Sequence, residues 1–206
     1  MRLYIGTPPV ERLVIADTGS DFIWVQCSPC QNCLPQDTSL FEPCLPHLRL
    51  QHVTQPRTLV PPSQRQCGKV GQCVYLNIYA NKSFTIEVVG TETLSFDSTG
   101  GAQTVSFPNS IFGCGANNNL TFRSSDKATG LVGLVAGQLS LVSQLGAQIG
   151  YKFSYLKFGS EAIITTNGVV STPLIIKPSL PSFTSSTLKS SPSAKRWCQR
   201  VESMTT

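Results

Sequence analysis

The chain has 206 residues, of which 13% are charged and 40% are hydrophobic, and its formal net charge is +5. This composition is too apolar for a chain that is disordered throughout, and no apolar run approaches the roughly 20 residues that span a bilayer. The segment from Lys177 to Thr206 has five basic residues and one acidic residue, so it holds +4 of the net charge. The rest is close to neutral, and a nucleic-acid-binding face is therefore not indicated there.

The first two thirds of the chain is predicted to be β structure. Short apolar or alternating runs that end at Gly, Pro, Asp or Asn are typical of strands. In chain order these runs are residues 3–5, 13–16, 22–25, 74–79, 84–89, 91–96 and 104–107. The fold class that this pattern predicts is all-β.

A β-hairpin and one short helix are the most local of the predicted elements. The runs 74–79 and 84–89 flank four residues, 80–83, and this arrangement predicts a hairpin with a four-residue tip, where Asn81 can tolerate a positive φ. A helix is predicted over 140–145, because three apolar residues share one face and a glycine follows, namely Leu139, Val142, Leu145 and Gly146.

Two stretches have no clear period and are predicted to be loop or disorder. The first, residues 45–66, contains four prolines and both histidines, His47 and His52. Neither histidine has a partner motif, and both are interpreted as exposed loop residues. The second stretch, residues 183–206, is rich in Ser, Thr and Lys.

Eight cysteines are present, and six of them fall between residues 27 and 73. An even, dense cluster predicts disulfides and an oxidising compartment, although no signal peptide is visible after Met1. A zinc ribbon needs two separated Cys-x-x-Cys pairs, and an iron–sulfur run needs a fourth cysteine where Asp37 stands. We therefore expect no metal, and we expect disulfides of open connectivity among Cys27, Cys30, Cys33, Cys44, Cys67 and Cys73.

The sequence Asp17-Thr18-Gly19-Ser20 follows an apolar run and is the main candidate site. An aspartate at a strand-to-turn junction presents its carboxylate outward. Thr18 offers a hydroxyl to the base of the turn, and Gly19 allows a tight turn beside the carboxylate. Ser20 is expected to hydrogen-bond the carboxylate and stabilise its ionised form. A bare Asp-Thr-Gly is most often an ordinary turn, so the interpretation depends on the surrounding sequence.

That surrounding sequence resembles the plant nepenthesin-type pepsin-like aspartic endopeptidases of family A1. The similarity covers about residues 1–44 and 67–182. The motifs that carry it are Ile5-Gly6-Thr7-Pro8-Pro9, Asp17 to Asp21, Trp24 to Cys27 with Cys30 and Cys33, Cys67 with Cys73, Tyr79, Thr91 to Leu94, Gly113-Cys114-Gly115, Gly130 to Leu134, Ser143 to Leu145 and Phe153-Ser154-Tyr155.

The resemblance implies a pepsin-like amino-terminal lobe with one or two short helices over residues 1–176. In this division residues 45–66 are a divergent loop, and residues 177–206 are the start of an inter-lobe segment followed by a disordered tail. Asp17 would be one of two catalytic aspartates, supported by Thr18, Gly19, Ser20, Trp24 and Gly133. Tyr79 would be the tyrosine of the substrate flap. The substrate would be a polypeptide, no cofactor would be needed, and the location would be extracellular or secretory/vacuolar.

The sequence departs from the family in several places. A second Asp-Thr/Ser-Gly is not found, because Asp37, Asp97 and Asp126 all lack the motif. A missing second lobe, and hence a truncated or inactive form, is therefore expected. The family's cysteine after Tyr155 is absent, so Cys114 is expected to have no disulfide partner. Ala80, Asn81 and Val135 also differ from the residues usual in the family.

Two alternatives to a conventional protease follow from these departures. One is a non-catalytic half-protease that binds peptides or partner proteins. The other is a homodimer in which each copy supplies one Asp17. Asn81-Lys82-Ser83 and Asn119-Leu120-Thr121 are glycosylation sequons that matter only on the secretory route. The segment Gly113 to Asn118 lacks the lysine and third glycine of a phosphate-binding loop.

Overall fold

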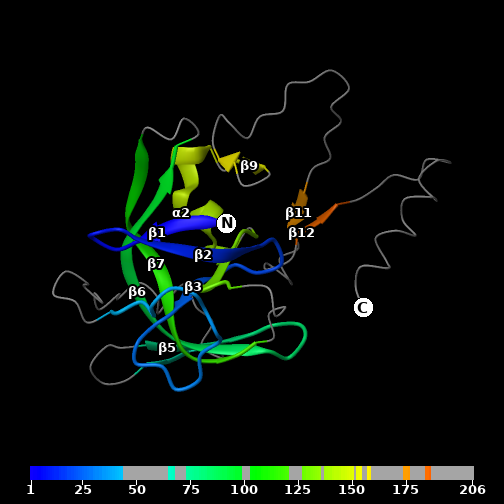
Figure 1. Ribbon diagram of the computed structural model, residues 1–206. Helices are drawn as coiled ribbons and strands as arrows, with labels where there is room; N and C mark the ends of the chain where they lie inside the picture. Colours follow the sequence, from blue (N-terminus) through cyan, green and yellow to red (C-terminus); the bar gives the residue numbers. More distant parts are fainter. Residues whose placement is uncertain are drawn as a thin grey trace.

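The computed structural model describes residues 1–43, 65–67, 73–98, 103–120, 127–135, 137–150, 152–154, 157–158, 174–176 and 184–186. The elements are shown in Figure 1. In chain order they are β1 (Arg2–Ile5), β2 (Val10–Asp17), β3 (Ile23–Gln26), β4 (Arg65–Cys67), β5 (Cys73–Ile78), β6 (Phe84–Asp97), β7 (Thr104–Asn119), β8 (Gly130–Gly133), α2 (Leu141–Leu145), the 3-10 helix η2 (Gly146–Ile149), β9 (Phe153–Ser154), β10 (Lys157–Phe158), β11 (Leu174–Ile176) and β12 (Thr184–Ser186). The predicted all-β fold class is confirmed.

One sheet forms most of the described molecule and closes on itself. Its strand order is β1-β2-β8-β3-β7-β6-β5-β4, and β1 also pairs with β6. The six strands β1, β2, β8, β3, β7 and β6 thus form a barrel, and β5 and β4 extend the sheet beyond it. Closure removes the exposed edges that an open sheet of this size would present. The pairings β2–β8 and β3–β7 are parallel, which brings together segments that are far apart in the sequence.

Strand β3 separates two apolar cores. Successive side chains of a strand point to opposite faces. Ile23 and Val25 accordingly pack in the larger core inside the barrel, whereas Phe22 and Trp24 pack in a smaller core with Tyr75, Val89, Leu131 and Leu139. All four residues of β3 are buried, which is why the apolar run of residues 22–25 is continuous and not alternating; the fourth strand residue, Gln26, is a buried amide.

The long strands β6 and β7 differ from the prediction. The runs 84–89 and 91–96 form one strand of 14 residues, and β7 extends over 16 residues although only 104–107 was predicted. Pro108 and Asn109 lie at a register shift, where Glu92 pairs with Ser110 and Leu94 pairs with Phe107. Asn109 has φ 59°. The proline therefore occupies a β-bulge, where its missing N–H disrupts no ladder, and the strand continues past it.

The predicted short helix is confirmed as α2. The Ser140 side chain accepts a hydrogen bond from the Ser143 N–H at 3.2 Å and caps its start, and Gly146 ends it with φ 47°. Gln144 joins the helix to β7, since its side chain accepts from the Ile111 N–H at 2.6 Å and donates to the Ile111 carbonyl at 2.9 Å. In Figure 1 the helix lies beside one end of the long strands.

The predicted hairpin is confirmed, with β5 and β6 paired from Val74–Val88 to Ile78–Phe84. The positive φ of the tip belongs to a residue other than Asn81, which was named as able to tolerate it. Lys82, with φ 66°, takes the left-handed conformation in place of Asn81. Asn81 instead accepts a hydrogen bond from the Ser83 N–H at 3.0 Å, which is the way a short amide side chain closes a local turn.

Both stretches predicted as loop contain strand residues. Arg65 and Gln66 belong to β4, and β12 lies within 183–206, paired antiparallel with β11. The loop prediction is wrong for these residues, because pairing with a distant strand supplies hydrogen bonds that a local pattern does not reveal. The rest of 45–66, with His47 and His52, and most of the tail lie outside the described residues. The division at residue 176 stays a prediction.

Candidate active site

Asp17 is the last residue of β2, beside the end of β8. Its backbone lies opposite Gly133 in the parallel register, and the Leu134 N–H donates to the Asp17 carbonyl at 2.8 Å. The half-buried side chain accepts a hydrogen bond at Oδ1 from the Gly19 N–H, also at 2.8 Å. This bond turns the chain back over the carboxylate as an Asx turn does. The carboxylate is thus held at the end of a strand that pairs with β1 on one side and β8 on the other.

The expected hydrogen bond from Ser20 to the carboxylate is not present. Ser20 is buried, and its hydroxyl has no hydrogen-bond partner among the described residues. Its carbonyl instead accepts from the Val135 N–H at 3.1 Å, which directs the side chain elsewhere. The backbone N–H of Gly19 takes the role that was predicted for Ser20. Thr18 is exposed at the tip of the turn.

Gly133 lies directly against the turn after Asp17. Its N–H donates to the Phe22 carbonyl at 2.9 Å. A Cβ at this position would lie 2.5 Å from the Phe22 nitrogen and 2.6 Å from the Ser20 carbonyl oxygen. These atoms are backbone, so they cannot rotate away. The contact explains why the last position of β8 requires a glycine.

Asp21 is a second carboxyl in the same turn, and sequence reasoning did not single it out. It is half-buried, and its carboxyl occupies the space that a side chain on Gly137 would fill. Burial raises the pKa of the Asp21 carboxyl above its ordinary value, while a hydrogen bond from its own backbone acts in the opposite direction. The available signal was its position directly after the Asp-Thr-Gly-Ser turn.

Tyr79 begins the hairpin tip and reaches the smaller core. The buried Trp24 donates from Nε1 to the Tyr79 hydroxyl at 2.7 Å, and Asn77 Nδ2 donates to the same oxygen at 3.1 Å. Burial raises the pKa of the Tyr79 hydroxyl, and the negative charges of Glu87 and Asp17 add to this effect. The hydroxyl therefore stays protonated. The structure brings Trp24 and Tyr79 together as expected, and it adds Asn77, which no sequence signal indicated.

The cysteine prediction is wrong for Cys114 and right for the existence of disulfides. Cys27 and Cys114 are bonded to each other, with their Cα atoms 5.2 Å apart, and Cys30 is bonded to Cys33. Parallel pairing of β3 with β7 places Val25 opposite Cys114, so Cys27 lies within reach of it. The lost partner expected from the family pattern is thus replaced by a cysteine of the cluster. Cys67 lies opposite Cys73 between β4 and β5, and the prediction that these two cysteines take part in disulfides stays a prediction of open connectivity. Cys44 lies outside the described residues.

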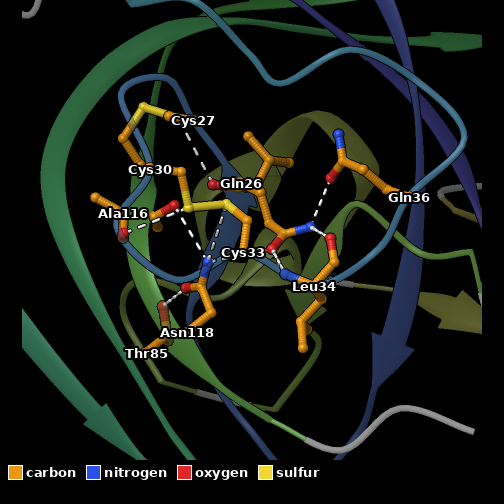
Figure 2. Close-up of a disulfide and its surroundings, with 12 residues drawn as sticks. Gln26, Cys27, Cys30, Cys33, Leu34, Gln36, Thr85, Ala116 and Asn118 are labelled. Atoms are coloured by element: carbon orange, nitrogen blue, oxygen red, sulfur yellow. Dashed lines mark hydrogen bonds between the residues drawn. A yellow bond between two sulfur atoms is a disulfide. The ribbon is translucent and has the colours of Figure 1, made fainter.

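Polar side chains anchor the segment that carries the Cys30–Cys33 disulfide (Figure 2). Gln26 donates to the Leu34 carbonyl at 3.0 Å and accepts from the Leu34 N–H at 2.6 Å. Asn118, at the end of β7, accepts from the Thr85 hydroxyl at 2.6 Å and lies beside Cys33. These buried amides fix the segment against β6 and β7, on the side of the sheet near Trp24.

The other acidic side chains that were considered are engaged away from Asp17. Asp37 forms an exposed ion pair with Lys127 at 2.7 Å, and Asp97 accepts from the Tyr4 hydroxyl at 3.0 Å. Asp126 lies outside the described residues. Within the described ranges, no group of three or more His, Cys, Asp or Glu side chains is arranged to hold a metal ion. No helix in those ranges is both long enough and apolar enough to cross a membrane.

Comparisons with known proteins agree with this geometry. The family model described as xylanase inhibitor N-terminal matches residues 1–162. A probable aspartic protease of Arabidopsis thaliana is 38% identical over 201 residues, which make up 87% of this chain and 44% of the relative. The aspartic proteinase nepenthesin-1 of Nepenthes gracilis is 39% identical over 202 residues, or 89% of this chain and 42% of the relative. The chain spans less than half the length of these relatives.

A solved structure shows the same fold. The crystal structure of edgp matches with a TM-score of 0.51 and 22% sequence identity, and the match covers 73% of this chain and 37% of that chain. At this identity the likeness concerns the fold alone. It agrees with a barrel whose strands β2 and β8 meet at the Asp17 turn.

Proposed function

Since the chain belongs to the plant nepenthesin-type family of pepsin-like aspartic proteases, as its amino-terminal lobe, we propose that the whole protein hydrolyses peptide bonds and that Asp17 is one of its two catalytic carboxylates. The observation that carries the proposal is the position of Asp17. Its carboxylate is held by the Gly19 N–H at the end of β2, and a tyrosine-bearing hairpin lies nearby.

Peptide-bond hydrolysis of this kind requires a second carboxylate beside Asp17, and aspartic proteases are the standard example of such a carboxyl pair. Two carboxyl groups about 3 Å apart cannot both ionise, so they share one proton. The ionised group takes a proton from water, and the protonated group polarises the peptide carbonyl. We propose that the second carboxylate comes from a matching turn of a second lobe. Two copies of this chain, each supplying Asp17, are the alternative source.

Tyr79 is proposed to close over an extended polypeptide substrate. Its hydroxyl accepts a hydrogen bond from Trp24 Nε1, which fixes the ring where the hairpin tip begins, while residues 80–82 remain exposed. An extended chain lying between this hairpin and Asp17 would be protected from water on one side. We propose Gly19, Ser20 and Gly133 as supports of the catalytic turn through the backbone contacts described above. We propose Thr18, exposed at the tip, as part of the same turn, and no cofactor enters this scheme.

An extracellular or secretory/vacuolar location is proposed as well. Two disulfides among the described residues are typical of an oxidising compartment. Asn81 and Asn119 are both exposed, so each is accessible to glycosylation on that route. Mass measurement before and after removal of N-linked glycans from secreted material would test the two sites.

The proposal is tested with Asp17→Asn. Asparagine keeps the oxygen that accepts from Gly19, so the turn should still form while the ionisable group is lost. The chain is mixed with the carboxyl-terminal half of a nepenthesin relative and assayed at acid pH on a denatured protein substrate. We expect activity to fall by about 100- to 10,000-fold. Asp37→Asn, whose carboxylate is paired on the surface with Lys127, is the matched control and should keep full activity.

Chain concentration distinguishes the two sources of the second carboxylate. If the chain alone is active and its rate rises with the square of concentration, two copies each supply Asp17. Equal activity of Asp17→Asn and the unmodified chain would contradict the proposed role of Asp17.

A non-catalytic binding function is the second candidate. It is favoured by the matching family model, whose description names an inhibitor. In this case a peptide would occupy the same place under Tyr79 without being cut. Binding of the unmodified chain to a denatured protein substrate, unchanged in Asp17→Asn and without cleavage in the presence of a second lobe, would support it.

A further inference from the structure

Glu87 is a carboxyl buried in the smaller core. It lies on β6, its side chain is 1% exposed, and it faces the same side of the sheet as Tyr75 and Val89. Its carboxyl occupies the space above Gly113 of β7, next to the ring of Phe22. A side chain on Gly113 would collide with it, so this glycine makes room for a carboxyl where an apolar core would otherwise close.

Neither carboxyl oxygen of Glu87 has a hydrogen-bond partner among the described residues. The neighbouring Thr85 hydroxyl has one proton, and it is donated to Asn118 Oδ1 at 2.6 Å. The ion pairs of the described residues join Arg2 to Glu11 and Lys127 to Asp37, so none involves Glu87. A buried carboxylate without a cation or a donor is strongly unfavourable, whereas the uncharged acid costs far less.

The groups that face Glu87 are two tyrosines and the acids near them. Tyr75 lies opposite it in the β5–β6 register, and Tyr79 follows on the hairpin tip. The charge of Glu87 acts on both hydroxyls, the charge of Asp21 acts on Tyr75, and the charge of Asp17 acts on Tyr79. Among the described residues, the titratable groups coupled to Glu87 are thus tyrosines and carboxyls, and none of these supplies a positive charge that would stabilise an ionised Glu87.

We propose that Glu87 is a positioning residue for the hairpin that carries Tyr79, and that it fits its place only as an uncharged carboxylic acid. At acid pH the small core is intact, and Tyr79 holds its bond to Trp24. When Glu87 ionises, the carboxylate must move toward water. The hairpin tip beside Tyr79 is exposed at residues 80–82, so we expect the Trp24–Tyr79 contact to be lost before the rest of the core opens. The link to catalysis rests on the proposed function, whereas the link to stability does not.

The direction of the pH effect follows from burial, which raises the pKa of Glu87 well above its ordinary value. The folded chain therefore holds this proton more tightly than the unfolded chain. The stability that the protonated Glu87 contributes is fully present below about pH 4.3, the ordinary pKa of an unfolded glutamate. It is lost as the pH rises through the raised pKa of the folded chain. The lobe is thereby adapted to an acidic compartment.

The test compares Glu87→Gln with the unmodified chain. Glutamine has nearly the same shape as the protonated acid and cannot ionise. Both chains carry Trp197→Phe, so that Trp24 is the remaining tryptophan. The thermal midpoint and the Trp24 fluorescence are measured from acid to neutral pH. Glu92→Gln is the matched control, because Glu92 lies on the same strand but accepts from the Thr93 N–H at 2.7 Å. Tyr79→Phe gives the fluorescence of a chain that lacks the Trp24–Tyr79 bond.

We expect the midpoint of the unmodified chain to fall as the pH rises and that of Glu87→Gln to stay level. The variant should melt about 4 °C or more above the unmodified chain at neutral pH, with no gain in acid. The thermal midpoint of Glu92→Gln should fall with rising pH as that of the unmodified chain does. The Trp24 emission of the unmodified chain at neutral pH should approach that of Tyr79→Phe.

A pH dependence that is the same in Glu87→Gln and the unmodified chain would overturn the proposal. If Glu87→Gln does not fold, the emission of the unmodified chain decides alone, and an emission independent of pH would equally overturn it. None of these measurements uses peptide cleavage. Failure of the Asp17→Asn test would therefore leave them valid, and their failure would leave the protease proposal untouched.

Discussion

At the scale of single residues, Lys82 has a strained backbone conformation, and its exposed side chain makes no buried contact that would offset the cost in free energy. It turns the hairpin tip with φ 66°, in the left-handed region that favours glycine, and its side chain is exposed. Lys82→Gly removes the clash of Cβ with the backbone and loses no buried contact. We expect the free energy of unfolding to rise by about 0.5–1 kcal/mol, the left-handed penalty less the extra freedom of glycine in the unfolded chain. Urea denaturation measures this change.

Asn109 is the control for this prediction. It has φ 59° in the bulge of β7 and is also exposed, but asparagine adopts the left-handed region more readily than lysine does. Asn109→Gly should therefore gain less than Lys82→Gly. Equal gains at both positions would show that the left-handed backbone by itself, and not the residue type, sets the cost.

At the scale of elements, the end of β8 and the turn after β2 form one packed unit. Gly133 brings the two backbones together, with 2.5 Å left between its missing Cβ and the Phe22 nitrogen. Gly133→Ala must displace the Asp17 turn or the end of β8. Since overpacking typically costs 1–3 kcal/mol, we expect a loss of about 2 kcal/mol or more in the free energy of unfolding, measured by denaturant titration.

Gly19→Ala is the matched substitution in the same turn. A Cβ on Gly19 would meet only the Asp17 side-chain oxygen, at 3.2 Å, and this atom can shift by a few tenths of an ångström. The expected loss is about 1 kcal/mol or less. The rigid backbone contact at Gly133 predicts this order, and the reverse order of the two losses would contradict it.

At the scale of the whole molecule, the two disulfides restrict the unfolded chain very differently. Cys27 and Cys114 are 87 residues apart in sequence, and Cys30 and Cys33 are three apart. In the chain-entropy model the first bond contributes about 4–5 kcal/mol and the second about 2 kcal/mol. The long bond also joins β3 to β7, on whose parallel pairing the barrel depends. We therefore expect it to decide whether the barrel forms.

Paired serine substitutions test this difference. The double variant of Cys27 and Cys114 should lose about 4–5 kcal/mol of unfolding free energy, and a domain of ordinary stability would then be largely unfolded. The double variant of Cys30 and Cys33 is the control and should lose about 2 kcal/mol. Circular dichroism during thermal denaturation compares the two. If both variants melt at the same temperature, loop length does not govern the contribution.

The sequence by itself determined the features whose causes are local. Alternating side chains and a four-residue tip predicted the β5–β6 hairpin, and an apolar face with a following glycine predicted α2. Asp17 was identified as the candidate carboxylate from a turn motif at the end of a strand. The hairpin and the helix depend on contacts between residues close in the chain, and a short segment of sequence therefore contains the information. The choice of Asp17 also needed the family motifs that are spread along the chain.

Only the tertiary structure decided the features that join distant segments. The parallel pairings of β2 with β8 and of β3 with β7 bring Gly133 under the Asp17 turn and Cys27 to Cys114. The β3–β7 pairing also gives Cys114 a disulfide partner, whereas the family pattern led us to expect none. The burial of Glu87 arises in the same way, because Gly113 of β7 and Phe22 enclose it from other strands. Pairing across the sheet is set by the summed fit of whole strands, which no single segment of the sequence expresses.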